Sequence, residues 1–327
     1  MARLYVTEQF ARIHLERGRL IVEQDGRMLA SYHKRTVDAI SVVGRVSVST
    51  PVIQHSLKGF CDIAFFSPGG KYLGRLSAAE GKNIPLRIAQ VRLLDNPERR
   101  SDLAATILEA KIRNCHRFIL RQKWNGWDGD VETELKRLKR WERKCRKVDD
   151  LAMLRSLEGK AAREYFRCLG LLVRPFCDFQ TRIRRPPVGI FNVLLSLGYS
   201  MVSAECAAAV ESTGLDPAIG VLHGIRYGRP SLGLDLVEEF RTPVAERLAV
   251  KLLTLKLPEF MNLPEDVNAL SEQALKRYFD FYEKLMTRPV KARYVHTTLR
   301  QAIHKQASSL ASYVRSGAFP YVPFYYR

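Results

Sequence analysis

The period of the hydrophobic pattern changes once along this chain, close to Gly81. Before that point, short apolar runs alternate with polar residues, and Asp25-Gly26 separates two of them as a hairpin turn would. Beyond it, apolar residues recur at three and four positions, which is the period of helices that bury one face. The pattern therefore predicts an α+β chain, with a small β-rich domain over residues 1–80 and a larger all-helical domain over residues 81–327.

The boundaries of the predicted elements follow from the same runs. Strands are expected over Arg12–Leu15, Leu20–Val22, Met28–Ala30, Ile40–Val43, Cys61–Phe66 and Tyr72–Leu76. A short helix begins at Thr50-Pro51, because proline is favoured in the first helical turn, and ends at Leu57. Longer helices are expected over Ile88–Leu94, Leu103–Leu120, Val131–Cys145, Val244–Lys256, Ser271–Met286 and Val295–Val314. The tail, Phe319–Tyr326, contains prolines and aromatic residues, and we expect it to dock on its own domain or on a partner.

The charge of the chain indicates a polyanionic partner. With 53 Lys+Arg against 34 Asp+Glu, the formal net charge is +19 and the pI is about 9.9. Such a field attracts phosphates at long range. The segment Lys136–Lys147 is rich in basic residues around Trp141, and it is either a solvated helix face or a surface that contacts phosphate.

A membrane surface is the competing partner for a basic protein. We find no apolar run long enough to span a bilayer and no basic amphipathic helix at either end. The first residues also lack a signal-peptide pattern, so a cytoplasmic protein without a membrane partner is expected. The cysteines form no C-x-x-C pair and are expected to be reduced.

The segment Gly214–Phe240 holds the strongest candidate for a chemical site. His223 ends a short apolar run, and a Gly/Arg/Pro turn then leads into a helix for which Ser231 is the expected N-cap. Asp235 and Glu238 stand three residues apart on that helix, so their side chains are neighbours. Two carboxylates and an imidazole that converge would favour a divalent cation such as Mn²⁺ or Mg²⁺. The alternative is a helix start with acids near its positive end and an unrelated histidine.

Three other polar residues lie on predicted helical faces that could approach this site. Glu158 borders an apolar stripe, and a carboxylate there needs a partner, either a metal shared with His223 or an arginine such as Arg155. Asn192 and Tyr199 lie seven positions apart and therefore on one face. They either approach the same site or are hydrogen-bonded polar groups in a core.

The chain resembles the metal-dependent endonuclease/integrase family of CRISPR adaptation, most closely its subtype I-C branch. The family pattern is E-G-x-A-A-x-x-Y-F, an Asn in a helix ending L-S-x-G-Y, then G-L-D-P-x-x-G-x-L-H and S-L-x-L-D-L-x-E-E-F-R. Glu158, Asn192, His223, Asp235 and Glu238 match it in order. Relatives often carry Asp where this chain has Glu238, and likewise Asp at the position of Glu246.

The resemblance implies that Glu158, His223 and Glu238 ligate Mg²⁺ or Mn²⁺, with Asp235 as a nearby acid and Asn192 as a further catalytic-site residue. It implies a homodimer formed through the N-terminal domain, which acts on double-stranded DNA together with the smaller CRISPR-associated adaptation partner protein. The implied activity is insertion of short foreign DNA into a CRISPR array, for antiviral defence. The rival hypothesis is a non-catalytic, dimeric DNA-binding scaffold.

Overall fold

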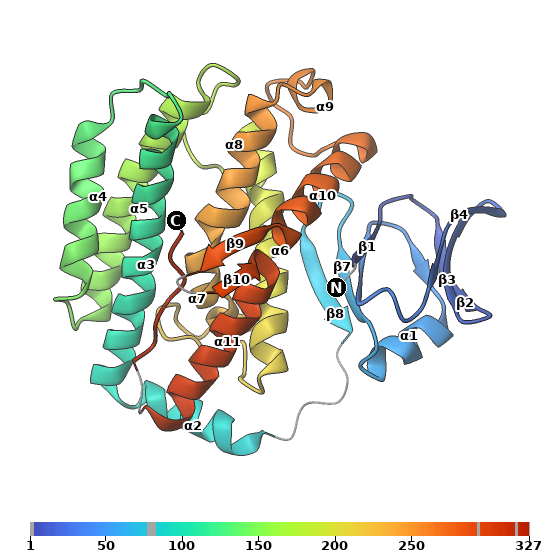
Figure 1. The fold of residues 1–327 in the computed structure, drawn as a ribbon, viewed down its shortest axis with the longest axis horizontal. Helices are drawn as coiled ribbons and strands as arrows, with labels where there is room; N and C mark the ends of the chain where they lie inside the picture. Colours follow the sequence, from blue (N-terminus) through green and yellow to red (C-terminus); the bar gives the residue numbers. More distant parts are fainter. Residues whose placement is uncertain (1–2, 77–82, 293–294, 318–319, 327) are drawn as a thin grey trace. The chain divides into compact units, whose positions relative to one another are not determined.

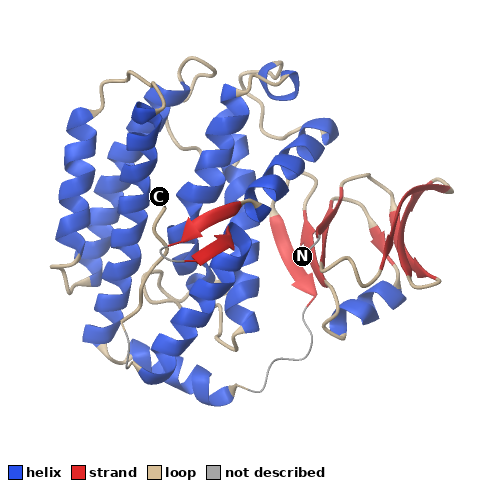
Figure 2. Cartoon of the chain, in the orientation of Figure 1, coloured by secondary structure: helices blue, strands red, loops and turns tan. Residues whose placement is uncertain are grey.

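A computed structural model describes residues 3–76, 83–292, 295–317 and 320–326 of the chain (Figure 1). The chain forms two compact units. The first comprises Met1–Gly81 together with Ala269–Glu283, and the second comprises Lys82–Asn268 together with Lys284–Arg327. Strands dominate the first unit and helices the second (Figure 2), which confirms the predicted α+β class.

The first unit is built from two four-stranded sheets. Their strands are β1 (Arg3–Val6), β2 (Arg12–Glu16), β3 (Arg19–Gln24), β4 (Arg27–His33), β5 (Ala39–Val43), β6 (Ser47–Val48), β7 (Asp62–Phe66) and β8 (Tyr72–Leu76). The strand orders are β1-β5-β7-β8 and β4-β3-β2-β6, and helix α1 (Thr50–Leu57) follows β6. Asp25 and Gly26 both have positive φ between β3 and β4, so the predicted hairpin is confirmed.

The core of the first unit collects the inward-facing residues of these strands, with Ile13, Leu20, Ile40 and Ile63 fully buried. Val42 on β5 is only 1% exposed and belongs to the same core, so its side chain does not face a partner. Strand β4 is an edge strand of its sheet, and it carries three exposed apolar side chains, Met28, Leu29 and Tyr32.

Helix α10 (Glu272–Thr287) differs from the sequence-based division, which assigned it to the helical domain. Residues 269–283 pack with the strand-rich unit. Phe279 stacks on Tyr5 with ring centroids 4.8 Å apart, and Lys276 pairs with Glu8 at 2.9 Å. An amphipathic period identifies a buried face but not the unit that buries it, and Tyr5 and Phe279 are more than 270 positions apart.

The second unit contains most of the helices. They are α2 (Ile84–Leu94), α3 (Pro97–Trp124), α4 (Glu132–Cys145), α5 (Leu151–Val173), α6 (Ile190–Ser212), α7 (Ser231–Phe240), the π-helix η1 (Arg241–Glu246), α8 (Arg247–Thr254), α9 (Pro258–Met261) and α11 (Leu299–Ser316). The all-helical prediction missed a hairpin of β9 (Pro289–Ala292) and β10 (Val295–Thr298). The predicted helix from Val295 therefore begins only at Leu299, where Thr298 and Gln301 form a capping box.

Helix α6 corrects the expectation that no apolar run could span a bilayer. By length and composition alone it could do so, with a mean hydropathy of 1.6 over its best window, of which 72% is buried within the protein. A central core helix has this composition because neighbouring helices cover it on most sides. The cysteines are all free, and all but Cys177 are buried.

The aromatic tail docks on its own unit. Glu239 accepts hydrogen bonds from the Tyr321 hydroxyl at 2.5 Å and from the Phe324 backbone N–H at 2.6 Å. Asn114 of α3 accepts one from the Tyr326 N–H at 2.8 Å. These bonds supply buried partners for a segment that forms no regular structure.

Candidate active site

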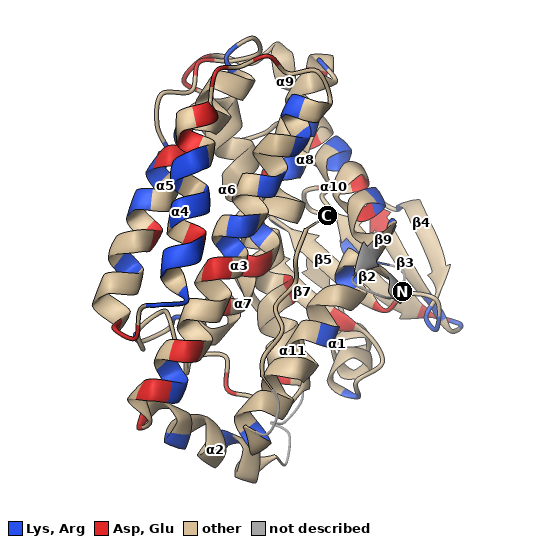
Figure 3. Ribbon diagram, turned by 60° about the vertical axis from the view of Figure 1, so that its left-hand side comes forward, with Lys and Arg blue, Asp and Glu red and all other residues tan. Residues whose placement is uncertain are grey.

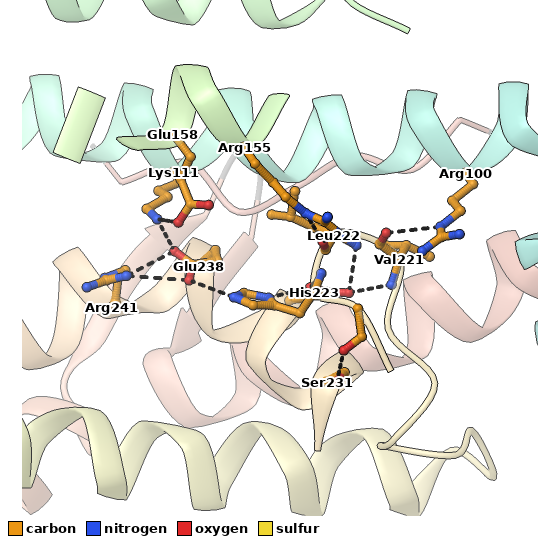
Figure 4. A network of polar contacts seen from close by, with 12 residues as sticks. Arg100, Lys111, Arg155, Glu158, Val221, Leu222, His223, Ser231, Glu238 and Arg241 are labelled. Atoms are coloured by element: carbon orange, nitrogen blue, oxygen red, sulfur yellow. Dashed lines mark hydrogen bonds and ion pairs between the residues drawn. The ribbon is translucent and has the colours of Figure 1, made fainter. Parts of the chain in front are cut away.

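Three helices of the second unit, α3, α5 and α7, bring the candidate residues together (Figure 4). Helix α5 begins at an N-cap, Asp150, whose carboxylate accepts from the N–H groups of Ala152 and Met153. Its predicted apolar stripe is buried as expected, and consists of Leu154, Leu157, Ala161, Tyr165 and Leu169. Glu158 lies at the margin of this stripe, with 27% of its side chain exposed.

Lys111 of α3 joins the carboxylates of α5 and α7. Its Nζ lies 2.6 Å from Oε1 of Glu158 and 2.7 Å from Oε2 of Glu238. Burial alone would lower the pKa of Lys111, but the two carboxylates outweigh it and raise the pKa. Burial would likewise raise the pKa of Glu238, yet Lys111, Arg241 and His223 hold it at about 2. The cluster therefore holds an ammonium ion between two carboxylates.

Asp235 orients His223. The carboxylate is fully buried and accepts hydrogen bonds from the backbone N–H groups of Val221, Leu222 and His223, at 2.6, 3.2 and 2.9 Å. Its Oδ1 also lies 2.7 Å from His223 Nδ1, which leaves Nε2 on the side of Glu238, 4.0 Å from Oε1. Burial lowers the pKa of His223, but Asp235 and then the glutamates outweigh it and raise the pKa.

The loop that carries His223 is held by side chains from the surrounding helices. Arg155 donates to the Leu222 carbonyl and Arg100 to the Val221 carbonyl, each at 3.2 Å through its closer nitrogen. Arg155 is therefore not the partner of Glu158. Ser231 is the first residue of α7 rather than its N-cap, because its hydroxyl donates to the Gly224 carbonyl instead of accepting from the helix.

Arg241 extends the cluster toward Glu246. It donates to Glu238 Oε2 at 3.2 Å and to Glu246 Oε1 at 3.1 Å. Glu246 is buried and also accepts from the hydroxyls of Tyr165, Tyr199 and Thr242. Arg241 and Glu246 are the first and last residues of the π-helix η1, whose Pro243 cannot donate a backbone hydrogen bond. Tyr199 thus contacts the network through Glu246, which here is a structural acceptor.

Asn192 does not join this network. Its side-chain oxygen accepts from Arg182 and from the Ile183 N–H, and its amide donates to the carbonyls of Thr181 and Val188. The amide therefore fastens the segment that precedes α6. Of the two alternatives for Asn192, the hydrogen-bonded structural role is the one that these contacts favour.

Sequence reasoning missed Lys111 and Arg241. A signal for Lys111 was present, because it occupies the buried stripe of α3 that also includes Leu108 and Cys115. A lysine at such a position needs a counter-charge. In the described part of the chain, no three His, Cys, Asp or Glu side chains stand arranged to hold a metal ion. Lys111 lies between two of the predicted ligands.

The chain matches a known protein family and named relatives. The family model described as CRISPR associated protein Cas1 matches residues 4–286. The CRISPR-associated endonuclease Cas1 1 of Moorella thermoacetica is 31% identical over 343 residues, which cover 99% of this chain and 98% of that relative.

Two solved structures share the fold. A chain of a Cas6-RT-Cas1–Cas2 complex superimposes with a TM-score of 0.81 and 23% identity over 97% of this chain and 35% of its own length. A casposase bound to integration product gives a TM-score of 0.81 and 22% identity, covering 98% of this chain and 92% of its own. With the family model matching most of its length, the chain belongs to the Cas1 family of CRISPR-associated proteins.

Proposed function

We propose that this protein is a divalent-metal-dependent DNA endonuclease and integrase that inserts short foreign DNA into a CRISPR array. The Moorella relative is named an endonuclease, and the casposase with a similar fold was solved with an integration product. The observation that carries the proposal is that Glu158 and Glu238 share the buried Lys111 ammonium, while His223 Nε2 lies 4.0 Å from Glu238 Oε1.

The chemistry of the donor set, rather than its present spacing, suits Mg²⁺ or Mn²⁺. Two carboxylates already share one cation, the Lys111 ammonium, and His223 presents Nε2 toward one of them. Oxygen-rich sets with one imidazole suit these ions better than zinc. A bound divalent ion would stabilise the negative charge that develops on the phosphate during strand transfer.

The protein's own residues position these donors. Asp235 fixes the imidazole so that Nε2 is available, and residues in such supporting positions contribute strongly to metal affinity. Arg241 also donates to Glu238 Oε2 at 3.2 Å. In the proposed reaction, the 3′-hydroxyl oxygen of the incoming DNA bonds to a phosphorus of the array and loses its proton. The bond from that phosphorus to the 3′-oxygen of the cut array strand breaks, and the leaving oxygen takes up a proton to become a 3′-hydroxyl.

Basic side chains supply the DNA-binding surface. Figure 3 shows Lys and Arg along α3, α4 and α8. In the run Lys136–Lys147, Arg137 pairs with Glu164 and Lys139 with Glu142, whereas Lys136, Arg143 and Lys144 are exposed. Such exposed charges release counterions from bound DNA, and affinity should then fall steeply with salt.

The proposal includes the assembly and its setting. We infer a cytoplasmic homodimer formed through the strand-rich unit, which has exposed apolar residues on the edge strand β4. The Cas1–Cas2 composition of a structural neighbour supports a smaller adaptation partner. The motifs around Glu158 and His223 favour the subtype I-C branch.

A non-catalytic DNA-binding scaffold is the second candidate. The Lys111 ammonium favours it, because the carboxylates are neutralised without any metal. A scaffold, however, gains nothing from a histidine oriented by a buried aspartate.

His223→Ala decides between the two. We expect it to abolish divalent-dependent cleavage and joining of DNA, because a candidate metal ligand is lost. The far-UV circular dichroism should stay unchanged, because the substitution removes little packed volume from the core. His304→Ala, on α11, is the matched control and should keep full activity. Full activity of His223→Ala at equal protein and metal would rule out the catalytic proposal.

A further inference from the structure

A groove of about 1750 Å³ in the second unit runs along a face of α3 that the candidate active site does not use. One wall is α3, with Arg113, Arg117 and Arg121. The other wall combines Arg146 and Lys147, which follow α4, with the docked tail. An α-helix turns about 100° per residue, so the side chain of Arg113 is rotated by roughly 200° about the helix axis from that of Lys111, which places it on nearly the opposite side. The groove and the carboxylate cluster therefore lie on opposite sides of α3.

The groove is lined by five basic side chains and by three acidic ones, Glu98, Asp102 and Asp149, so positive charge is in excess. Arg113 and Arg146 lie 3.8 and 3.5 Å from Glu109, so that single carboxylate serves two guanidinium groups. Arg117 and Lys147 are exposed, and their side chains make no hydrogen bond or ion pair with any residue that the structure describes. The α3 arginines repeat every four residues, about 6 Å apart along the axis, a spacing comparable to that of successive phosphates in an extended strand.

Aromatic rings accompany these charges. The Arg113 guanidinium lies over the ring of Tyr325 at 4.2 Å, and that of Arg121 lies over Tyr326 at 5.6 Å. The docked tail therefore holds the arginine row in place. Trp124, at the end of α3, also lines the groove and is 70% exposed. An indole ring that is so exposed beside a row of cations is a platform for stacking.

We propose that this groove binds single-stranded nucleic acid, with phosphates along the α3 arginines and an unpaired base on Trp124. Duplex bases are already stacked and cannot lie on the indole, which favours a single strand. The inference rests on the proposed function only in taking DNA as the working substrate. It adds a binding surface on which no chemistry occurs.

The test is a titration of the full-length protein, in EDTA, with an oligo-dT of about 12 nucleotides, a length within single-strand site sizes. Tryptophan fluorescence and its salt dependence are measured, and oligo-U compares RNA with DNA. The groove variant is Arg117→Ala/Lys147→Ala, whose side chains have no partners to lose. The matched control, Arg92→Ala/Arg315→Ala, removes the same charge from exposed positions of α2 and α11 outside the groove lining. The variant Trp124→Leu shows whether the change in fluorescence on binding comes from Trp124.

We expect the groove variant to flatten the logarithmic salt slope by about 1.4 and to bind about 25-fold more weakly at 0.1 M salt. The control should change both quantities much less. Trp124→Leu should abolish the quenching and weaken binding about 5-fold or more.

Equal losses in the groove and control variants would overturn the proposal, since only the overall charge would then matter. A duplex of equal length that binds as tightly as oligo-dT, and that also depends on Arg117 and Lys147, would overturn the proposal. Displacement of oligo-dT by polyglutamate of equal charge would overturn it too. His223→Ala should keep this binding in EDTA. If His223→Ala abolishes DNA cleavage but neither the wild type nor any variant binds oligo-dT in the groove, the groove proposal is refuted and the proposed function is not.

Discussion

Lys111→Met tests how the carboxylate cluster is held together. Methionine keeps most of the buried alkyl chain and removes the ammonium group. Glu238 would keep Arg241 at 3.2 Å, but Glu158 would lose its 2.6 Å contact with Lys111. The substitution therefore leaves two acids near one another with a single positive neighbour.

The size of the effect follows from burial. Removing one partner of a buried ion pair costs about 3–5 kcal/mol, because the remaining charge stays desolvated. Lys111 and Glu238 each have 6% of the side chain exposed, whereas Glu158 has 27% and can be rehydrated in part. We therefore expect a loss near the lower bound, about 3 kcal/mol in the free energy of unfolding.

Urea unfolding followed by far-UV circular dichroism measures this loss. The control is Lys276→Met, which removes ion pairs of 2.9 Å to Glu8 and 3.0 Å to Glu272. This lysine side chain is 47% exposed, and the two glutamates are 24% and 49% exposed. Such pairs contribute about 0–1 kcal/mol. Mn²⁺ should stabilise Lys111→Met more than the wild type, because the ammonium no longer competes for the carboxylates. Isothermal titration calorimetry should show tighter Mn²⁺ binding.

Two results would refute this reasoning. If Lys111→Met and Lys276→Met lost the same stability, the buried ammonium would not be the counter-charge that the geometry indicates. If Mn²⁺ bound the wild type more tightly than Lys111→Met, the ammonium would not occupy the cation position.

Three further predictions follow from other parts of the chain. Asp235→Asn replaces an acceptor of four N–H groups with an amide, so we expect about 1–3 kcal/mol less stability in urea and a roughly 10- to 100-fold loss of activity; unchanged kinetics would contradict the orienting role. Burial raises the pKa of Glu239 from 4.5 to about 7, so the folded state holds a proton that the unfolded chain releases. About 3 kcal/mol of stability, complete below pH 4.5, should disappear as the pH rises through 7, and Glu239→Gln should lack this slope in pH-dependent urea unfolding. Met28→Asp/Tyr32→Asp should weaken self-association in sedimentation, whereas the equally exposed Leu73→Asp should not; a dimer that survives the double substitution would place the interface elsewhere.

The sequence by itself determined the local structure and the local part of the site. Alternation before Gly81 and the helical period after it follow from which side chains must be buried, so the strands and most helices were predictable. Asp235 and Glu238 are neighbours on α7 because they stand three positions apart, a relation that any helix imposes. The resemblance to the family motifs predicted that Glu158 and His223 share this site.

Only the tertiary structure decided which buried faces meet. Lys111 and Glu158 are 47 positions apart, and their contact depends on α3 packing against α5, which no local pattern encodes. The same reason explains why α10 joins the strand-rich unit and why Asn192 fastens a loop instead of approaching the carboxylates. A helical period shows that a face is covered. The partner that covers it, and hence the charge that each buried acid faces, depends on long-range packing of the whole unit.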